Sequence, residues 1–189
     1  RLDGVTGVQT CALPIYKWFS VTSKEIEEVL QTARRFPVAQ AKILARKLYQ
    51  KSISVYGAGL MQPVASRWRT QFAENAKTLA SCEAMPEMFH HEVEGWLFPK
   101  FKIKRSAAIF LTDKNEPGWL MKKKRVAMSA IQEHGADVVE LKARGTGGLA
   151  RVFSMIMLGD WTSYELAKLN KIDPMSICVI DRIKKAVKG

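Results

Sequence analysis

Residues 53–96 read ISVYGAGLMQPVASRWRTQFAENAKTLASCEAMPEMFHHEVEGW, and the order of residue types in them indicates the kind of fold to expect. The β-branched and aromatic run from Ile53 to Tyr56 predicts a strand, Gly57-Ala58-Gly59 ends it, and a long helical pattern follows. A strand, a glycine turn and a helix open a parallel α/β unit, in which ligands bind at the carboxyl end of the strand beside the helix N-terminus. Gly57 and Gly59 are therefore candidate substrate-binding residues.

The glycine turn does not match a dinucleotide fingerprint. A GxGxxG motif requires a glycine three residues after Gly59, and the chain has Gln62 there. We therefore expect no nicotinamide site.

The segments around this stretch alternate between strand and helix patterns. Continuous apolar strands are expected within residues 104–111 and 138–141, and amphipathic helices over 119–134 and 149–169, with a last helix opened by Asp173 and Pro174. His134 is interpreted as a helix-end residue followed by the C-cap glycine Gly135. This alternation predicts an α/β fold, a three-layer αβα sandwich with a mainly parallel, flavodoxin-like sheet.

Composition and charge bound the function classes. The 189 residues carry 30 Lys and Arg against 18 Asp and Glu, a net charge of +12. That charge suits nucleic acid, a membrane surface or a phosphorylated small molecule. The longest basic run, Lys122 to Arg125, is interpreted as a solvated helix face, and no apolar run approaches the ~20 residues that span a bilayer. We expect no membrane and no nucleic-acid partner; nucleic acid would need basic and aromatic residues gathered on one face.

The three cysteines, Cys11, Cys82 and Cys178, are far apart and odd in number. They suggest neither a disulfide framework nor a metal knuckle, and idle thiols are typical of a reducing cytoplasm. We expect no metal and no cofactor.

Residues 1–36 differ in sequence pattern from the rest of the chain. Residues 1–15 have no strand or helix period and resemble a translated sequencing adapter, so we expect a non-native artefact there. Residues 16–36 contain one helical pattern and are expected to form a linker helix from a missing N-terminal domain. Residues 37–189 are expected to form one α/β domain.

Polar side chains on the helix after the glycine turn form a candidate acid/base group. Arg67, Gln71 and Glu74 share one face, as do Gln71 and Asn75, because residues three and four apart are helix neighbours. The carboxylate of Glu74 could serve as a general base. Alternatively, Glu74 is a surface carboxylate paired with Arg67 or Lys77.

Four motifs in a fixed order resemble the C-terminal half of the bifunctional phosphoglucose/phosphomannose isomerases, members of the SIS (sugar isomerase) superfamily. They are RWRTQFAENAK (67–77), PEMFHHEVEGW (86–96), LGDWTSYELA (158–167) and NKIDPMSICVIDRIKK (170–185).

The resemblance implies catalytic roles. Glu74 matches the base that moves a proton between carbons 1 and 2 of the opened sugar. His90 matches the histidine that helps to open the ring and that a partner subunit supplies, so a homodimer is expected. Lys184 matches a lysine near the ring oxygen. Arg67, Gln71, Asn75 and Ser176 fall in the matching motifs and are candidate contacts to the phosphorylated hexose.

Departures from the family pattern leave the epimer preference open. Phe89 and His91 replace the two asparagines around the histidine, Ala73 replaces the Asn before the glutamate, and Met175-Ser176 replaces Thr-Pro. In the family the phosphate is held mainly by a first SIS domain, so we expect this chain alone to bind substrate weakly and to turn over little. A non-catalytic SIS module that binds a phosphosugar is the alternative.

Overall fold

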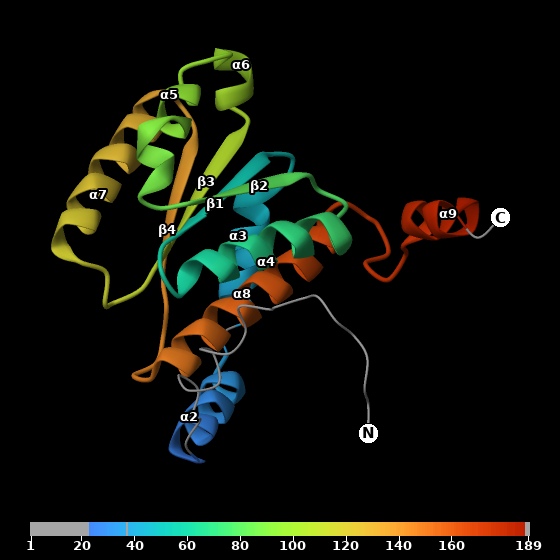
Figure 1. Cartoon of the computed structure of the whole chain (residues 1–189). Coiled ribbons are helices and arrows are strands. Elements are labelled where there is room, and N and C mark those ends of the chain that lie inside the picture. Colours follow the sequence, from blue (N-terminus) through green and yellow to red (C-terminus); the bar gives the residue numbers. More distant parts are fainter. Residues whose placement is uncertain (1–22, 37, 188–189) are drawn as a thin grey trace, which may run out of the picture.

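Four parallel strands form the centre of the protein, in the order β2-β1-β3-β4. The computed structural model describes residues 23–36 and 38–187. Figure 1 shows the sheet between two layers of helices, with the last helix projecting from the body. The strands and helices are α2 Ser23–Arg34, α3 Val38–Leu48, β1 Ser52–Gly57, α4 Met61–Glu74, β2 Ala80–Ala84, η1 Glu87–His90, α5 Glu92–Gly95, α6 Lys100–Ile103, β3 Ser106–Thr112, α7 Gly118–Glu133, β4 Asp137–Lys142, α8 Gly148–Leu169 and α9 Cys178–Ala186.

The two central strands have the composition that burial on both faces requires. Every residue of β3 is buried, and β3 pairs in parallel with β1, with Val55 opposite Ile109. The predicted strands at 53–56, 104–111 and 138–141 are confirmed with small shifts of their ends. β2 was not predicted, because its sequence ASCEA lacks the β-branched and aromatic residues that mark a strand, and it lies half-buried at the sheet edge.

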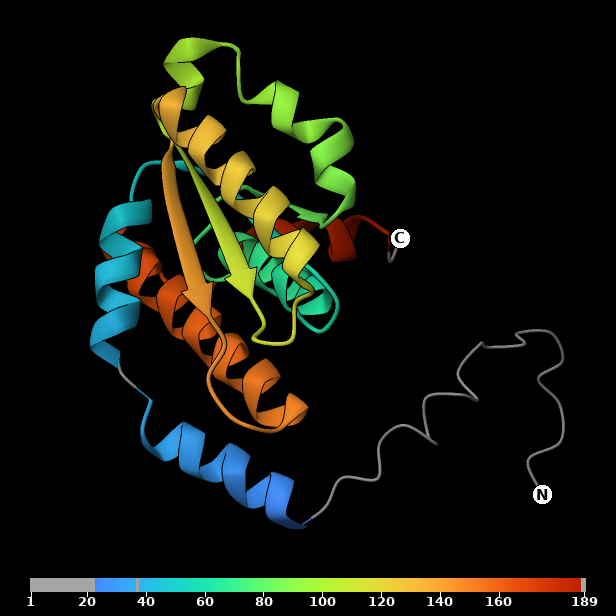
Figure 2. The same ribbon diagram turned by 90° about the vertical axis from the view of Figure 1, so that its left-hand side faces the viewer.

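Each face of the sheet carries its own core. α3, α4 and α8 pack on one face around Trp68 and Phe72. α7 covers the other face, together with Met88 of η1, Trp96 directly after α5 and Ile103 of α6. The prediction of a three-layer αβα fold is confirmed (Figure 2).

The N-terminal predictions are covered only in part. The expected artefact at residues 1–15, and residues 16–22 of the expected linker, lie outside the described residues. Within the segment expected to be a linker, the structure describes α2, which has no buried residue and packs against α8. Glu28 joins the two helices, since its carboxylate accepts hydrogen bonds from the backbone N–H groups of Thr146 and Gly147 just before α8.

Two local predictions are wrong. The last helix begins at Cys178 rather than at Asp173, because the Asp173 carboxylate accepts the N–H of Met175 at 2.9 Å and holds a turn. The basic run at 122–125 is not wholly solvated, because Lys124 is 1% exposed. Its ammonium forms an ion pair with the buried Glu116.

One close contact fixes α4 against α8. The indole Nε1 of Trp68 donates to the Met155 carbonyl at 2.8 Å, and the ring lies directly over Gly159. A Cβ at position 159 would stand 2.3 Å from Trp68 Nε1, far inside van der Waals contact. Only glycine lets the two helices approach this closely.

Gly159→Ala should therefore lower the free energy of unfolding by about 1–3 kcal/mol, the usual cost of overpacking a filled core. Chemical denaturation followed by circular dichroism measures it. Gly95→Ala is the matched control, since a Cβ there meets nothing within 4 Å. Equal stability of the two variants would contradict the packing described here.

Candidate active site

Glu74 is the last residue of α4, the helix that follows the glycine turn. The helix ends there because Lys77 adopts a left-handed backbone conformation, φ 51°, that turns the chain toward β2. The ammonium of Lys77 also donates to the carbonyl of Glu74. Glu74 itself is exposed at the edge of the sheet where the strands begin.

A cavity of about 470 Å³ lies beside Glu74 and joins two distant stretches of the sequence. One wall comes from the end of α4 and the start of β2, and the other from the segment leading into α9. The lining is mainly apolar, with Glu74, Lys77, Thr78 and Ser176 as its polar groups. The structure thus brings together the predicted residues Glu74 and Ser176. The complete lining is Ala73, Glu74, Lys77, Thr78, Leu79, Ser176, Ile177, Cys178, Val179 and Ile180.

Three other predicted substrate contacts lie on α4 or directly after it, and two of them, Arg67 and Asn75, contact α8. Arg67 forms a two-point ion pair with Asp160, at 2.8 and 3.2 Å. Asn75 donates to Gln71 Oε1 at 3.0 Å and to Ser163 Oγ at 2.8 Å. None of the three predicted residues lines the cavity beside Glu74.

The glycine turn lies at the opposite end of α4 from Glu74. Because α4 has 14 residues, the two ends are about 20 Å apart. Gly57 is needed for packing, since a Cβ there would lie 2.2 Å from the Met61 carbonyl oxygen, and Gly59 has φ +51°. Gly57 and Gly59 stay predicted ligand contacts, but they do not share the cavity of Glu74.

His90 lies on the other side of the sheet from Glu74. It ends η1, which follows β2 and packs on the face covered by α7. A cavity of about 420 Å³ there is lined by His90, Phe89, Val93 and residues 122–130 of α7. Within one subunit the imidazole and the carboxylate therefore belong to different layers.

Lys184 lies on α9, the helix whose first turn lines the cavity of Glu74. It is exposed, as is the rest of α9, and Figure 1 shows this helix standing away from the body. Lys184 follows Ile180 by one helical turn, about 6 Å along the axis. α9 therefore holds Lys184 on the Glu74 side of the molecule.

A buried hydrogen-bond network holds the segment that carries His90. Tyr56 on β1 donates its hydroxyl to Glu92 at 2.8 Å, and the indole of Trp96 donates to the Tyr56 oxygen at 3.0 Å. Burial and the negative charge of Glu92 raise the pKa of Tyr56 far above its usual value, so Tyr56 stays a donor. The sequence analysis missed this network, although Glu92 lies in one of the four motifs.

A second network was also missed, at the carboxyl ends of β3 and β4. The ammonium of Lys124 contacts Glu116 and Thr112 and lies 3.3 Å from Glu140, and Arg151 pairs with Asp113 at 2.9 Å. These buried pairs fix the loop after β3. The basic run 122–125 and the loop acids were visible in sequence, but their pairing depends on the α7–β4 contact.

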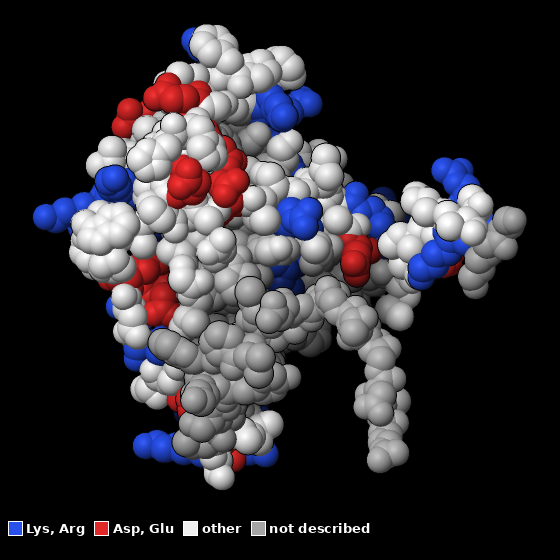
Figure 3. Space-filling view, in the orientation of Figure 1, with Lys and Arg blue, Asp and Glu red and all other residues white. Residues whose placement is uncertain are grey.

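Other kinds of site find no support in the part of the chain that the structure describes. Within it, no cluster of three or more His, Cys, Asp or Glu side chains has the arrangement to hold a metal ion. No described helix combines the length and apolar character that crossing a bilayer requires. On the face shown in Figure 3, basic and acidic side chains are interspersed.

Comparison with known proteins identifies the family. Residues 38–187 match the model of the bacterial phospho-glucose isomerase C-terminal SIS domain. The chain belongs to this family. A bifunctional phosphoglucose/phosphomannose isomerase of Aquifex aeolicus is 31% identical over 149 residues, which cover 79% of this chain and 46% of the relative. The corresponding protein of Caldicellulosiruptor bescii is 32% identical over 145 residues, 76% of this chain and 43% of the relative.

Solved structures agree with this assignment. A glucose-6-phosphate isomerase-like protein from Thermus thermophilus superposes with a TM-score of 0.62 at 26% identity, covering 82% of this chain and 54% of that one. The sugar isomerase domain of an RpiR transcription factor from Sphaerobacter thermophilus has a TM-score of 0.61 at 12% identity, over 92% and 99% of the two chains, and shares the fold. The chain spans about half the length of the curated relatives that it matches.

Tyr56→Phe should lower the free energy of unfolding by about 1–3 kcal/mol, because it leaves the Glu92 carboxylate and the Trp96 indole without their shared partner. Denaturant titration of the folded chain measures the loss. The control is Tyr164→Phe, which removes a hydroxyl from a residue that is 42% exposed on α8. If both variants unfold at the same denaturant concentration, the Tyr56 hydroxyl does not stabilise the segment.

Proposed function

We propose that this chain is the catalytic SIS half of an aldose–ketose isomerase that acts in the cytoplasm on phosphorylated hexoses. The reaction is interconversion of glucose 6-phosphate, mannose 6-phosphate or both with fructose 6-phosphate. The proposal is supported by family membership, by the names of the relatives, and above all by the cavity that Glu74 shares with Ser176 and the start of α9.

The chemistry needs one base that reaches two neighbouring carbons. After ring opening, the Glu74 carboxylate takes the proton from carbon 2 of the aldose, and the electron pair forms a cis-enediolate. Return of the proton to carbon 1, together with transfer of the hydroxyl proton from oxygen 2 to oxygen 1, gives the ketose, so the carboxylate is regenerated and no external reductant is needed. Lys184, on the helix that borders the cavity, stabilises the negative charge on oxygen.

The apolar lining of the cavity favours this role for Glu74. Leu79 is 88% exposed and Val179 is 58% exposed in the single chain. Contact with another domain or subunit would cover these side chains and exclude water from the carboxylate. A carboxylate that has lost its hydrating water is a stronger base.

His90 enters the reaction from a second subunit of a homodimer. Its position on the face opposite Glu74 within one chain supports this arrangement, since an imidazole of the same subunit would have to cross the sheet. The partner's imidazole then donates and accepts the proton at the ring oxygen and the anomeric hydroxyl.

The 189-residue chain alone should interconvert glucose 6-phosphate and fructose 6-phosphate at least about 100-fold more slowly than a chimera carrying the first half of the Aquifex aeolicus relative, because the phosphate is not positioned. A coupled assay on both proteins measures this ratio. Equal rates would show that the chain needs no preceding domain.

Mixing two inactive chimeras tests the shared site. Glu74→Gln and His90→Ala should each abolish turnover, and a 1:1 mixture that exchanges subunits should recover about a quarter of the wild-type rate, since a heterodimer contains one intact site. The assay follows fructose 6-phosphate formation before and after mixing.

The matched controls are Glu133→Gln and His134→Ala, which change two exposed residues at the end of α7. Each of these single variants should keep its activity. Turnover by the Glu74→Gln variant would show that Glu74 is not the base. Inactive variants without recovery on mixing would place both groups in one subunit's site. Saturable binding of fructose 6-phosphate by the unsubstituted chimera without interconversion would support the alternative, a non-catalytic phosphosugar-binding module.

A further inference from the structure

A cavity of about 200 Å³ lies between α2, α3 and α8, beside the end of β4, far from the Glu74 side of the molecule. Its polar lining contains two arginines, a lysine, an amide and two hydroxyls, and no carboxylate. The complete lining is Thr32, Arg35, Phe36, Gln40, Lys142, Arg144, Ser154, Met155 and Leu158. Of these residues only Leu158 falls in one of the four motifs, and the proposed reaction uses none of them.

After the hydrogen bonds within the protein are made, the side chains at this cavity have unused donors but few unused acceptors. Arg144 Nη2 donates to Gln40 Oε1 at 2.9 Å, so the Gln40 amide nitrogen and the rest of the guanidinium keep their hydrogens. Ser154 Oγ accepts the backbone N–H of Arg144 at 3.0 Å and donates its own hydrogen to the Arg151 carbonyl at 2.7 Å. A ligand that fits this inventory supplies acceptors.

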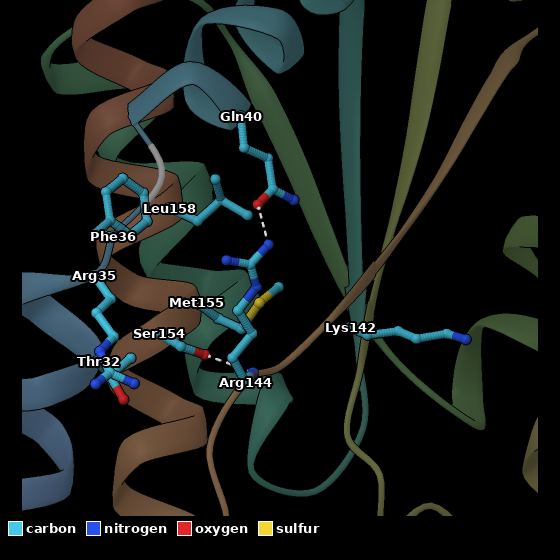
Figure 4. Close-up of a pocket in the computed structure, with 9 residues that line it drawn as sticks. All are labelled: Thr32, Arg35, Phe36, Gln40, Lys142, Arg144, Ser154, Met155 and Leu158. Atoms are coloured by element: carbon cyan, nitrogen blue, oxygen red, sulfur yellow. Dashed lines mark hydrogen bonds between the residues drawn. The ribbon is translucent and has the colours of Figure 1, made fainter.

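The charge of the lining is also unbalanced. Among the described residues, neither Arg35 nor Arg144 forms an ion pair with a carboxylate. In Figure 4, Arg144 reaches toward Gln40. Arg35 and Thr32 lie at the other end of the lining, and Lys142 is directed away from the other lining residues. The nearby carboxylate of Glu28 is occupied by Thr146 and Gly147.

We propose that this cavity binds a short-chain phosphate monoester, with its phosphate on Arg144 and Gln40. A phosphate dianion offers only acceptors, and arginine matches its geometry. The apolar wall of Phe36, Met155 and Leu158 contacts the carbon chain, and Thr32 and Arg35 hold the far end. The volume is below the roughly 300–1,000 Å³ of sites for drug-sized ligands, which favours a small metabolite.

Such a ligand fastens α2 to the domain. Thr32 and Arg35 belong to α2 and the residue after it, whereas Gln40, Arg144 and Leu158 belong to the body of the protein. Because α2 buries none of its residues, a molecule that bridges these groups adds to its contact with α8 and to the hydrogen bonds of Glu28. The site is independent of the proposed isomerase reaction and can be tested without turnover.

Glycerol 3-phosphate is the probe, titrated into the ¹⁵N-labelled 189-residue chain. We expect saturable amide shifts centred on Arg35, Gln40, Arg144 and Ser154, and slower amide hydrogen exchange across α2. Glycerol at the same concentrations should produce neither effect, and inorganic phosphate should compete.

Arg144→Gln and Arg35→Gln should each raise the Kd for glycerol 3-phosphate about tenfold, the usual effect of losing a charge-assisted hydrogen bond. The control is Arg34→Gln, which removes a neighbouring exposed charge that does not line the cavity. Shifts confined to residues 73–79 and 176–180, no saturation, or equal weakening by Arg34→Gln would each overturn the proposal. All three arginines are exposed, so the variants should fold, and their amide spectra check it.

Discussion

The contact between α4 and α8 is the constraint on which the position of the candidate base depends. Trp68 lies over Gly159, and the ring nitrogen is tied to the backbone of α8. The ion pair of Arg67 with Asp160 and the hydrogen bond of Asn75 to Ser163 extend this contact toward the end of α4. The contact sets the angle and depth of α4, and Glu74 is placed at the edge of the sheet as the residue where that helix stops.

The same geometry explains why the motif residues do not form one site in one chain. A helix that follows a strand returns to the edge where the strand began, so the end of α4 and the glycine turn are separated by the height of the sheet. The next connection, which carries His90, crosses on the opposite face. Residues that are close in sequence are therefore distributed over two edges and two faces of the chain.

Much of the fold could be predicted from sequence because its signals are local. The buried strand β3, the glycine turn after β1 and the cap at Gly135 each follow from a short stretch of residue types. β2 could not be predicted in this way, because its half-buried residues are weak strand formers and it is held by pairing with β1. The burial of Lys124 could not be predicted for a related reason: its partner Glu116 lies in the loop before α7, and sequence spacing does not report that contact.

For the candidate site, the sequence indicated which residues to consider, but not where they lie relative to one another in the fold. Glu74 and Ser176 lie at one cavity, which the order of motifs could not show, because it depends on where the chain runs after α8. The Tyr56–Glu92–Trp96 network escaped notice because a hydroxyl, a carboxylate and an indole on separate elements have no period in sequence.

The contact of Glu28 with the start of α8 has a consequence for how α2 responds to acid. Hydrogen bonds from the Thr146 hydroxyl and from the backbone of Thr146 and Gly147 hold the pKa of the Glu28 carboxyl below its usual range. A carboxyl group whose pKa is depressed by folding favours the docked helix above its unfolded pKa, and this contribution is lost as the pH falls through the folded pKa. Acid strong enough to protonate Glu28 in the folded chain would therefore weaken the contact between α2 and the start of α8, so the docking of this helix depends on pH.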